Sequence, residues 1–332
     1  MKRSAVVAII AEVAAELGVR VVVEPGARFS ARVELPDGRR RYMRDAVFDL
    51  NGAGATEVAR DKDFASFFLR QSGFPVPEGR AFCTTRWARR IGSPESFDTA
   101  WRYAKQLGLP VIVKPNGKSQ GSGVTLAPNK REFHSAVRLA STDERMYLVQ
   151  RRYMGNDFRI VALDGDVISA YERVPLRVTG DGVRSIAELL QRRQDEFIAR
   201  GRDTRLRIPD PRVTAVLRRA RLTLDSVIEE GRELVLTDAA NLSAGGEAID
   251  RTNDLHPGWR QLAADIASEM SLRYVGVDVL TATPLSQVPG AYIILEVNAA
   301  PGLDHYAAVG AKQQELVRNL YERVLRALID LP

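Results

Sequence analysis

Hydrophobic and polar positions along this chain follow two periods, one typical of strands and one typical of helices. The apolar runs at 111–114, 274–280 and 293–297 are short and strand-like. Residues 310–331 repeat apolar positions at helical spacing, which predicts a helix that covers the core. Because helical stretches separate the strands, the pattern predicts an α/β fold with two or three compact units in 332 residues.

The first 56 residues are predicted to form a small unit ahead of the main body. They contain an amphipathic helix at 5–17, a strand at 19–24, and two hairpin-like strands joined at Pro36–Gly38. The helix is apolar enough to imitate a signal peptide, but glutamates interrupt it at helical spacing. We therefore expect a reduced N-terminal α/β cap on a cytoplasmic protein.

The run from Ile293 to Gly302 carries the clearest chemical signal. Glu296 and Asn298 lie two residues apart on a predicted strand, so their side chains project from the same face. Asp278 lies within a second apolar strand, where an unpaired carboxylate is costly. Two carboxylates and an amide oxygen suit Mg²⁺ and leave positions free for phosphate oxygens. The alternative is that both carboxylates form buried ion pairs and that Asn298 is a turn residue.

A loop of small residues follows the strand that ends at Lys114. Such a loop can lay backbone N–H groups against phosphate oxygens, and the neighbouring lysine supplies a point charge. It lacks both the Walker order and the three-glycine dinucleotide fingerprint, so a plain hairpin is the alternative. The small residues of this loop are Gly117, Ser119, Gly121, Ser122 and Gly123.

Two further segments carry polar groups that suit a ligand. Asp157 and Arg159 share one strand face, where a carboxylate can accept from ribose hydroxyls and a guanidinium can bind phosphate or a substrate carboxylate. A cross-strand salt bridge is the alternative. The stretch 241–250 is a second small-residue loop with an amide in front, which suggests a place for an acceptor substrate or an acyl-phosphate.

Charge and composition narrow the class of protein. The net charge is +6, but the arginines of 191–207 alternate with acids and lack aromatic neighbours, which predicts a solvated face and not a nucleic-acid site. That stretch could instead attract an acidic substrate, a peptide with a free carboxylate or an acidic carrier protein. No apolar run is long enough to span a membrane, and the single Cys83 excludes an intramolecular disulfide.

The order of these motifs resembles the ATP-grasp superfamily. More narrowly, the segments are similar to the ATP-grasp region of cyanophycin synthetases and of the fused glutamate-cysteine ligase/glutathione synthetases, in unbroken order from about Asn51 to the C-terminus. The motifs are Lys62, KPNGKSQGSG, the pair Asp157 and Arg159, ERVP around Arg173, NLSAGG, GVDV and EVNAAPG. The resemblance implies an ATP-grasp fold in which two α+β subdomains grip ATP.

The resemblance also implies a domain plan for a stand-alone chain. Residues 1–56 would form the reduced cap, and 57–332 the ATP-grasp domain. Within that domain we expect linking helices at 57–110, a lid subdomain with the Gly/Ser loop at 111–150, and a catalytic subdomain at 151–332 with an insert at 179–240.

Each matched residue takes an implied role from the resemblance. The residues expected at the phosphates are Lys62, Lys114, Gly121, Ser122 and Gly123. The hinge at the adenine would contribute Gln150, Arg151 and Tyr153, and Asp157 would hold the ribose. The residues expected to steady the transferred phosphoryl group and the substrate carboxylate are Arg159, Arg173 and Asn241. Substrate would also meet Ser243, Gly245 and Gly246, and magnesium would bind Asp278, Glu296 and Asn298.

Two departures affect these expectations. Gln150 stands where related chains often carry an acidic residue, and Lys118, Ser119 and Gln120 replace a more typical loop interior.

The implied activity is that of an ADP-forming ligase. It would join a carboxylate to an amine, between amino acids or on a small peptide, through an acyl-phosphate. ATP and two Mg²⁺ ions would be required, with Mn²⁺ as a possible substitute. The alternatives are a ligase that adds an amino acid to a protein or carrier acceptor, and an ATP-binding regulatory module without turnover. A homodimer is possible, and neither nucleic acid nor membrane is expected as a partner.

Overall fold

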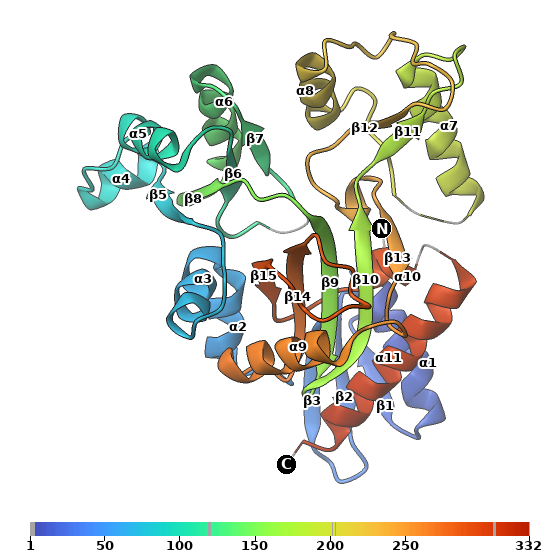
Figure 1. The fold of residues 1–332 in the computed structure, drawn as a ribbon. Helices are drawn as coiled ribbons and strands as arrows, with labels where there is room; N and C mark the ends of the chain where they lie inside the picture. The colour runs from blue at the N-terminus through green and yellow to red at the C-terminus, as the bar shows by residue number, and fades with distance from the viewer. Residues whose placement is uncertain (1–3, 119–120, 201, 203, 308–309, 332) are drawn as a thin grey trace.

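The computed structural model describes residues 4–118, 121–200, 202, 204–307 and 310–331 (Figure 1). Three larger sheets, all antiparallel, and one two-stranded ribbon organise these residues, with helices packed against the sheets. None of the described helices is both long enough and apolar enough to cross a bilayer. The mixed α/β architecture expected from the sequence is therefore present.

The central sheet has the strand order β13-β10-β9-β14-β15. Its strands are β9 (Asn156–Leu163), β10 (Asp166–Val174), β13 (Glu247–Asp250), β14 (Tyr274–Thr281) and β15 (Tyr292–Asn298). Helix α9 (Pro257–Glu269) covers one face, where Trp259 and Ile266 pack against Val277 and Val279 in one apolar cluster. The helices α2 (Ala53–Arg60) and α3 (Lys62–Gln71) lie at the β15 edge.

The N-terminal cap shares its core with the end of the chain. Its helix is α1 (Ala5–Glu16), and its sheet consists of β1 (Arg20–Val23), β2 (Ser30–Glu34), β3 (Arg40–Arg44) and β4 (Val47–Phe48). The long α11 (Ala311–Ile329) lies beside α1, and the short α10 (Asp304–Ala307) precedes it (Figure 1). One apolar cluster joins Val13, Val33, Tyr274 and Tyr321, so cap, central sheet and C-terminal helix form a single core.

A separate four-stranded sheet, which we call the β5–β8 unit, stands above the central sheet in Figure 1. Its strands are β5 (Gly79–Cys83), β6 (Val111–Pro115), β7 (Thr125–Ala127) and β8 (Met146–Arg151), and its helices are α4 (Thr85–Ile91), α5 (Phe97–Leu107) and α6 (Lys130–Ala140). Strand β5 comes from the stretch 57–110, for which we expected only linking helices. Five residues carry little periodicity, and the partner β8 lies far along the chain, so the sequence pattern did not reveal this strand.

The insert at 179–240 has an apolar core of its own. Strands β11 (Arg177–Thr179) and β12 (Glu233–Val235) pair at its base, and helices α7 (Ile186–Ala199) and α8 (Pro211–Arg219) pack above them. Leu190, Leu217 and Ile228 belong to its buried cluster. The chain then passes through the short 3-10 turn Leu242–Ala244 into β13.

Candidate active site

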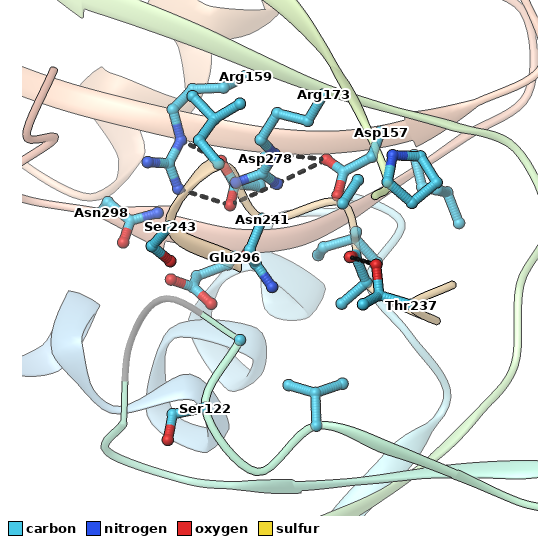
Figure 2. A pocket seen from close by; sticks show the side chains of 18 of the residues that line it. Ser122, Asp157, Arg159, Arg173, Thr237, Asn241, Ser243, Asp278, Glu296 and Asn298 are labelled. Atoms are coloured by element: carbon cyan, nitrogen blue, oxygen red, sulfur yellow. Dashed lines mark hydrogen bonds and ion pairs between the residues drawn. The ribbon is translucent and has the colours of Figure 1, made fainter. Parts of the chain in front are cut away.

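A cavity of about 1510 Å³ lies between the β5–β8 unit and the central sheet, with further walls from the cap and the insert (Figure 2). Fifteen residues predicted from the sequence line it, and they come from α3, the β5–β8 unit, the central sheet and the segments next to them. They are Lys62, Lys114, Gly121, Ser122, Gln150, Arg151, Tyr153, Asp157, Arg159, Arg173, Asn241, Ser243, Asp278, Glu296 and Asn298. Gly123, Gly245 and Gly246 are not among the lining residues, and Ser119 and Gln120 lie outside the described residues.

Strand register brings the charged side chains of the central sheet together. Asp278 on β14 lies opposite Glu296 on β15 and opposite Arg159 on β9. Asp157, two residues before Arg159, lies opposite Arg173 on β10. Directly opposed residues and residues two apart share a face of a sheet, so these groups project together into the cavity. The intervening apolar residues project toward α9 on the other face.

The two arginines and the two aspartates form one buried network (Figure 2). Arg159 donates to both oxygens of Asp278, at 2.6 and 2.8 Å. Arg173 reaches Asp278 at 2.9 Å and Asp157 at 2.5 Å. Asp157 is therefore in the cross-strand ion pair that we considered as the alternative, with Arg173 as its partner. Asp278 is likewise in the buried ion pair that was the alternative to metal binding.

The pKa values of the two carboxyl groups in this network shift in opposite directions. Burial raises the pKa of both carboxyl groups. Asp278, however, contacts Arg159 as well as Arg173, and their positive charges hold its pKa below the ordinary value. Burial raises the pKa of Asp157 to about 6, and the negative charge of Asp278 acts in the same direction, while Arg173 opposes both. The carboxyl group with the single shared guanidinium is therefore the one that protonates more readily.

Glu296 and Asn298 offer oxygen ligands without an arginine partner. The Glu296 carboxylate lies 3.6 Å from the Lys62 ammonium, and the buried Asn298 amide nitrogen has no hydrogen-bond partner among the described residues. Gly276, opposite Asn298, packs closely against Pro301, since any Cβ there would lie 2.8 Å from the Pro301 side chain. No group of three or more His, Cys, Asp or Glu side chains in the described chain could hold a metal. The candidate ligands comprise two carboxylates and an amide, which fit a hard cation that completes its shell with phosphate oxygens.

Two lysines line the cavity near Glu296. Lys114, on β6, is only 8% exposed, and burial lowers its pKa to about 8 although Glu296 acts in the opposite direction. Lys62, at the start of α3, donates to the Lys118 carbonyl at 2.6 Å. Asn116 donates to Asp61 at 2.6 Å and so ties the start of the Gly/Ser loop to the start of α3. Our sequence analysis missed Asn116 and Asp61, because their pairing spans 55 residues.

The Gly/Ser loop approaches the small-residue loop at 241–246. Gly121 has φ of +62°, and a Cβ there would lie 1.7 Å from the Asn241 amide nitrogen. Figure 2 shows Asn241 between the arginine network and the loop that carries Ser122. Gly123, at φ of +76°, packs against Pro115. A side chain at either glycine would be strained, and one at Gly121 would also push the two loops apart.

A buried arginine from the insert holds the loop at 241–246. Arg202 is 6% exposed, donates to the carbonyls of Leu242 and Gly246 at 2.5 and 2.7 Å, and stacks over Phe197. Its burial contradicts the solvated face that we predicted for 191–207. Its contacts lie some 40 residues away, at a loop with no charged residue to mark them, so the sequence contained no signal for its burial.

The other end of the cavity is apolar. Ile112 on β6 pairs with Leu126 on β7 and with Gln150 on β8, so all three face the cavity. Gln150 is buried, Arg151 pairs with Glu78 at 2.7 Å, and Tyr153 accepts a hydrogen bond from the Glu78 amide. Further apolar side chains that line the cavity include Pro77, Met154, Leu280 and Leu295. These could flank a planar heterocycle, and the sequence analysis proposed none of them as site residues.

Comparison with known families assigns this fold and cavity to a class. A model of the RimK-like ATP-grasp domain matches residues 88–181 and 236–318, more than half of the chain. The chain therefore belongs to the RimK-like ATP-grasp family. The unmatched stretch between the two segments lies within the insert.

Curated relatives are similar over most of this chain. Cyanophycin synthetase from Crocosphaera subtropica is 34% identical over 317 residues, covering 92% of this chain and 34% of that protein. The glutathione biosynthesis bifunctional protein GshAB from Streptococcus mutans is 29% identical over 64% of this chain and 28% of that protein. The chain thus spans about a third of the length of these relatives.

A solved structure shares the fold. The bifunctional glutathione synthetase from Pasteurella multocida superposes with a TM-score of 0.60 at 20% identity, over 97% of this chain and 44% of that chain. At this identity the similarity concerns the fold alone. The ATP-grasp architecture that the motifs implied is confirmed.

Proposed function

We propose that this protein is an ATP-dependent ligase that joins a carboxylate to an amine through an acyl-phosphate and releases ADP. The observation that carries the proposal is the convergence of Lys62 and Lys114 with Glu296, Asn298 and Asp278 on one cavity in a chain of the ATP-grasp family. The similarity to a cyanophycin synthetase and to a glutathione biosynthesis protein supports the same reaction class, because both products contain amide bonds.

The cavity has room for a nucleotide and a second ligand. Its volume of about 1510 Å³ exceeds the roughly 300–1,000 Å³ typical of pockets for one small molecule. The base would lie at the apolar end beside Ile112 and Gln150, and the phosphates would extend toward Lys114 and Lys62. Asp157 would have to exchange Arg173 for the ribose hydroxyls. Such an exchange is a consequence of the proposal that a nucleotide complex would test.

Glu296 and Asn298 would hold magnesium, with Asp278 joining them by releasing one arginine contact. Bound Mg²⁺ neutralises the charge that develops on the transferred phosphoryl group. Freed guanidinium groups of Arg159 and Arg173 would then face phosphate or substrate carboxylate. We propose two ions, with Mn²⁺ as a substitute.

The proposed reaction has two steps. A substrate carboxylate oxygen attacks the γ-phosphorus and ADP leaves, and the amine nitrogen then attacks the acyl carbon while inorganic phosphate departs and the amine loses a proton. The tetrahedral oxyanion that forms when the amine attacks the acyl carbon would be stabilised by Arg173 or by backbone N–H groups at 241–246 until phosphate departs. The acceptor would be an amino acid or a small peptide held beside Asn241 and Ser243.

Oxygen labelling tests the reaction class. ADP release is first screened against pairs of amino acids and dipeptides in the presence of magnesium. The active pair is then repeated with ¹⁸O in the carboxyl group of the acid, and products are identified by mass spectrometry. We expect one heavy oxygen in inorganic phosphate. Label in AMP, or stoichiometric pyrophosphate, would overturn the acyl-phosphate route.

A further inference from the structure

Arg219 connects two parts of the molecule beside the cavity, the insert and the β5–β8 unit. It lies at the end of α8 in the insert, and its guanidinium contacts Asp238 at 2.5 Å and Glu132 at 3.8 Å. Glu132 belongs to the first turn of α6 in the β5–β8 unit. Asp238 lines the cavity, three residues before Asn241. One side chain of the insert thus bridges the β5–β8 unit and the segment that leads into the loop at 241–246.

This cluster differs from an ordinary surface ion pair. The side chains of Arg219, Glu132 and Asp238 are 20%, 18% and 28% exposed, so solvent screens them only partly. The buried Nη1 of Arg219 makes no hydrogen bond within the described chain and faces Glu132, while Nη2 contacts Asp238, so both carboxylates share the one guanidinium charge. Exposed pairs contribute little, whereas the contact between the buried Nη1 of Arg219 and Glu132 is partly shielded from solvent and favours one relative position of the insert and the β5–β8 unit.

A second contact couples the same two parts. Asn241 fits against Gly121 of the Gly/Ser loop so closely that no Cβ could be placed between them. Helix α6, which carries Glu132, packs on β6 and β7, the strands that flank this loop. Arg202 meanwhile fixes the loop at 241–246 to the insert. A shift of the β5–β8 unit away from the insert would therefore break both the Arg219–Glu132 and the Asn241–Gly121 contacts.

We infer that Arg219 is a positioning residue that couples closure of the β5–β8 unit over the nucleotide to placement of the loop at 241–246. The inference rests on the proposed function, since it assumes that the cavity binds a nucleotide. With the ion pair formed, the unit that carries Lys114 stays near the central sheet, and Asn241 stays near the transferred group. The affinity for the nucleotide and the KM for the amine then both depend on the Arg219 side chain.

Binding of Mg-ADP, measured by calorimetry, tests the first half without knowledge of the acceptor. Arg219→Met and Glu132→Gln should each weaken Mg-ADP binding at least about fivefold. The double variant should be no weaker than the single ones, because both remove the same bridge. Arg219→Lys, which keeps the charge, should recover part of the affinity. Arg218→Met, at the exposed neighbouring position, is the matched control and should bind like the wild type.

Kinetics with the active substrate pair test the second half. Asp238→Asn should raise the KM for the amine more than it weakens Mg-ADP binding, whereas Glu132→Gln should act mainly on the nucleotide. A residue that only stabilises the fold would lower the melting temperature without this split. Unchanged Mg-ADP affinity in folded Glu132→Gln and Arg219→Met proteins would overturn the inference. If the wild type fails to bind Mg-ADP, the proposed function fails, and the inference falls with it.

Discussion

At the scale of single residues, the site depends on charges that have been removed from water in opposing pairs. Arg159 and Arg173 hold Asp278 ionised, whereas Glu296 and Asn298 keep their oxygen atoms available. Lys114 is nearly buried and has a lowered pKa. Under the proposed function, phosphate would pair with Lys114 and a cation with Glu296 and Asn298, so the environment of these three groups would favour ligand binding over stability of the empty fold.

Glu296→Gln tests the proposed cation site. The substitution keeps the shape and removes one charge, so ADP release should fall by at least about a hundredfold while the melting temperature stays near that of the wild type. Calorimetry should also show that magnesium no longer strengthens ATP binding. Glu57→Gln, at an exposed position on α2, is the control. Normal turnover by folded Glu296→Gln protein would rule out this assignment.

Lys114 predicts a pH dependence of nucleotide binding. Its pKa near 8 means that the free protein carries the charged lysine below pH 8 and the neutral one above. Phosphate binds the charged form, so ATP affinity should weaken above pH 8, approaching about tenfold per pH unit. Lys114→Met should bind ATP more weakly at pH 7 and show no such dependence between pH 7.5 and 9.5.

Adenosine provides the comparison ligand for this prediction. It lacks phosphate, so its affinity should be the same across the pH range and in both proteins. An equal pH dependence for adenosine and ATP would mean that Lys114 has a structural role only.

At the scale of elements, loops are positioned by side chains from elsewhere. The turn at 241–246 contains no charged residue, and its carbonyls are held by Arg202 of the insert. The Gly/Ser loop is tied to α3 through Asn116 and Asp61. Such cross-links let short, small-residue segments keep a defined shape without a regular hydrogen-bond ladder.

Arg202→Met tests the first of these cross-links. Two buried carbonyls would lose their donor, so the loop should lose its fixed position and turnover should fall at least about tenfold. Mg-ADP binding should change much less than acceptor kinetics. Arg200→Met, at an exposed position after α7, is the control and should behave like the wild type. Equal kinetics for the two variants would contradict the role of Arg202.

At the scale of the whole molecule, the cap and the C-terminal helix form one core with the central sheet. Phe48 of the cap is 6% exposed and packs edge-on against Tyr274 of β14, with Tyr321 of α11 beside it. The cap also contributes Ala46 and Val47 to the cavity wall. It therefore stabilises the site as well as the fold.

Phe48→Ala tests this shared core. Removal of the buried ring should lower the free energy of unfolding by about 3–5 kcal/mol, measured by denaturant titration with fluorescence and circular dichroism. Both probes should report one coincident transition, because cap and body unfold together. Val47→Ala, at the exposed neighbouring position, should change stability by less than about 0.5 kcal/mol. A separate early transition of the cap would contradict a shared core.

The sequence by itself determined which polar side chains of the central strands share a face. Period-two alternation put Asp157 with Arg159, and Glu296 with Asn298, on common faces, and the order of motifs was enough to indicate the ATP-grasp family. These inferences rest on local backbone geometry, which a short window of residues encodes. The short strand β5 was not predicted, because its five residues show too little hydrophobic periodicity.

The tertiary structure alone decided which of these groups meet. Strand register brought Asp278 between Arg159 and Arg173. Chain folding brought Arg202 to the loop at 241–246 and Arg219 to Glu132, in both cases across a long separation in sequence. Arginines in the insert look alike in sequence because burial and charge pairing depend on neighbours contributed by other segments. Periodicity specifies the face of an element, whereas long-range packing selects the partner on that face.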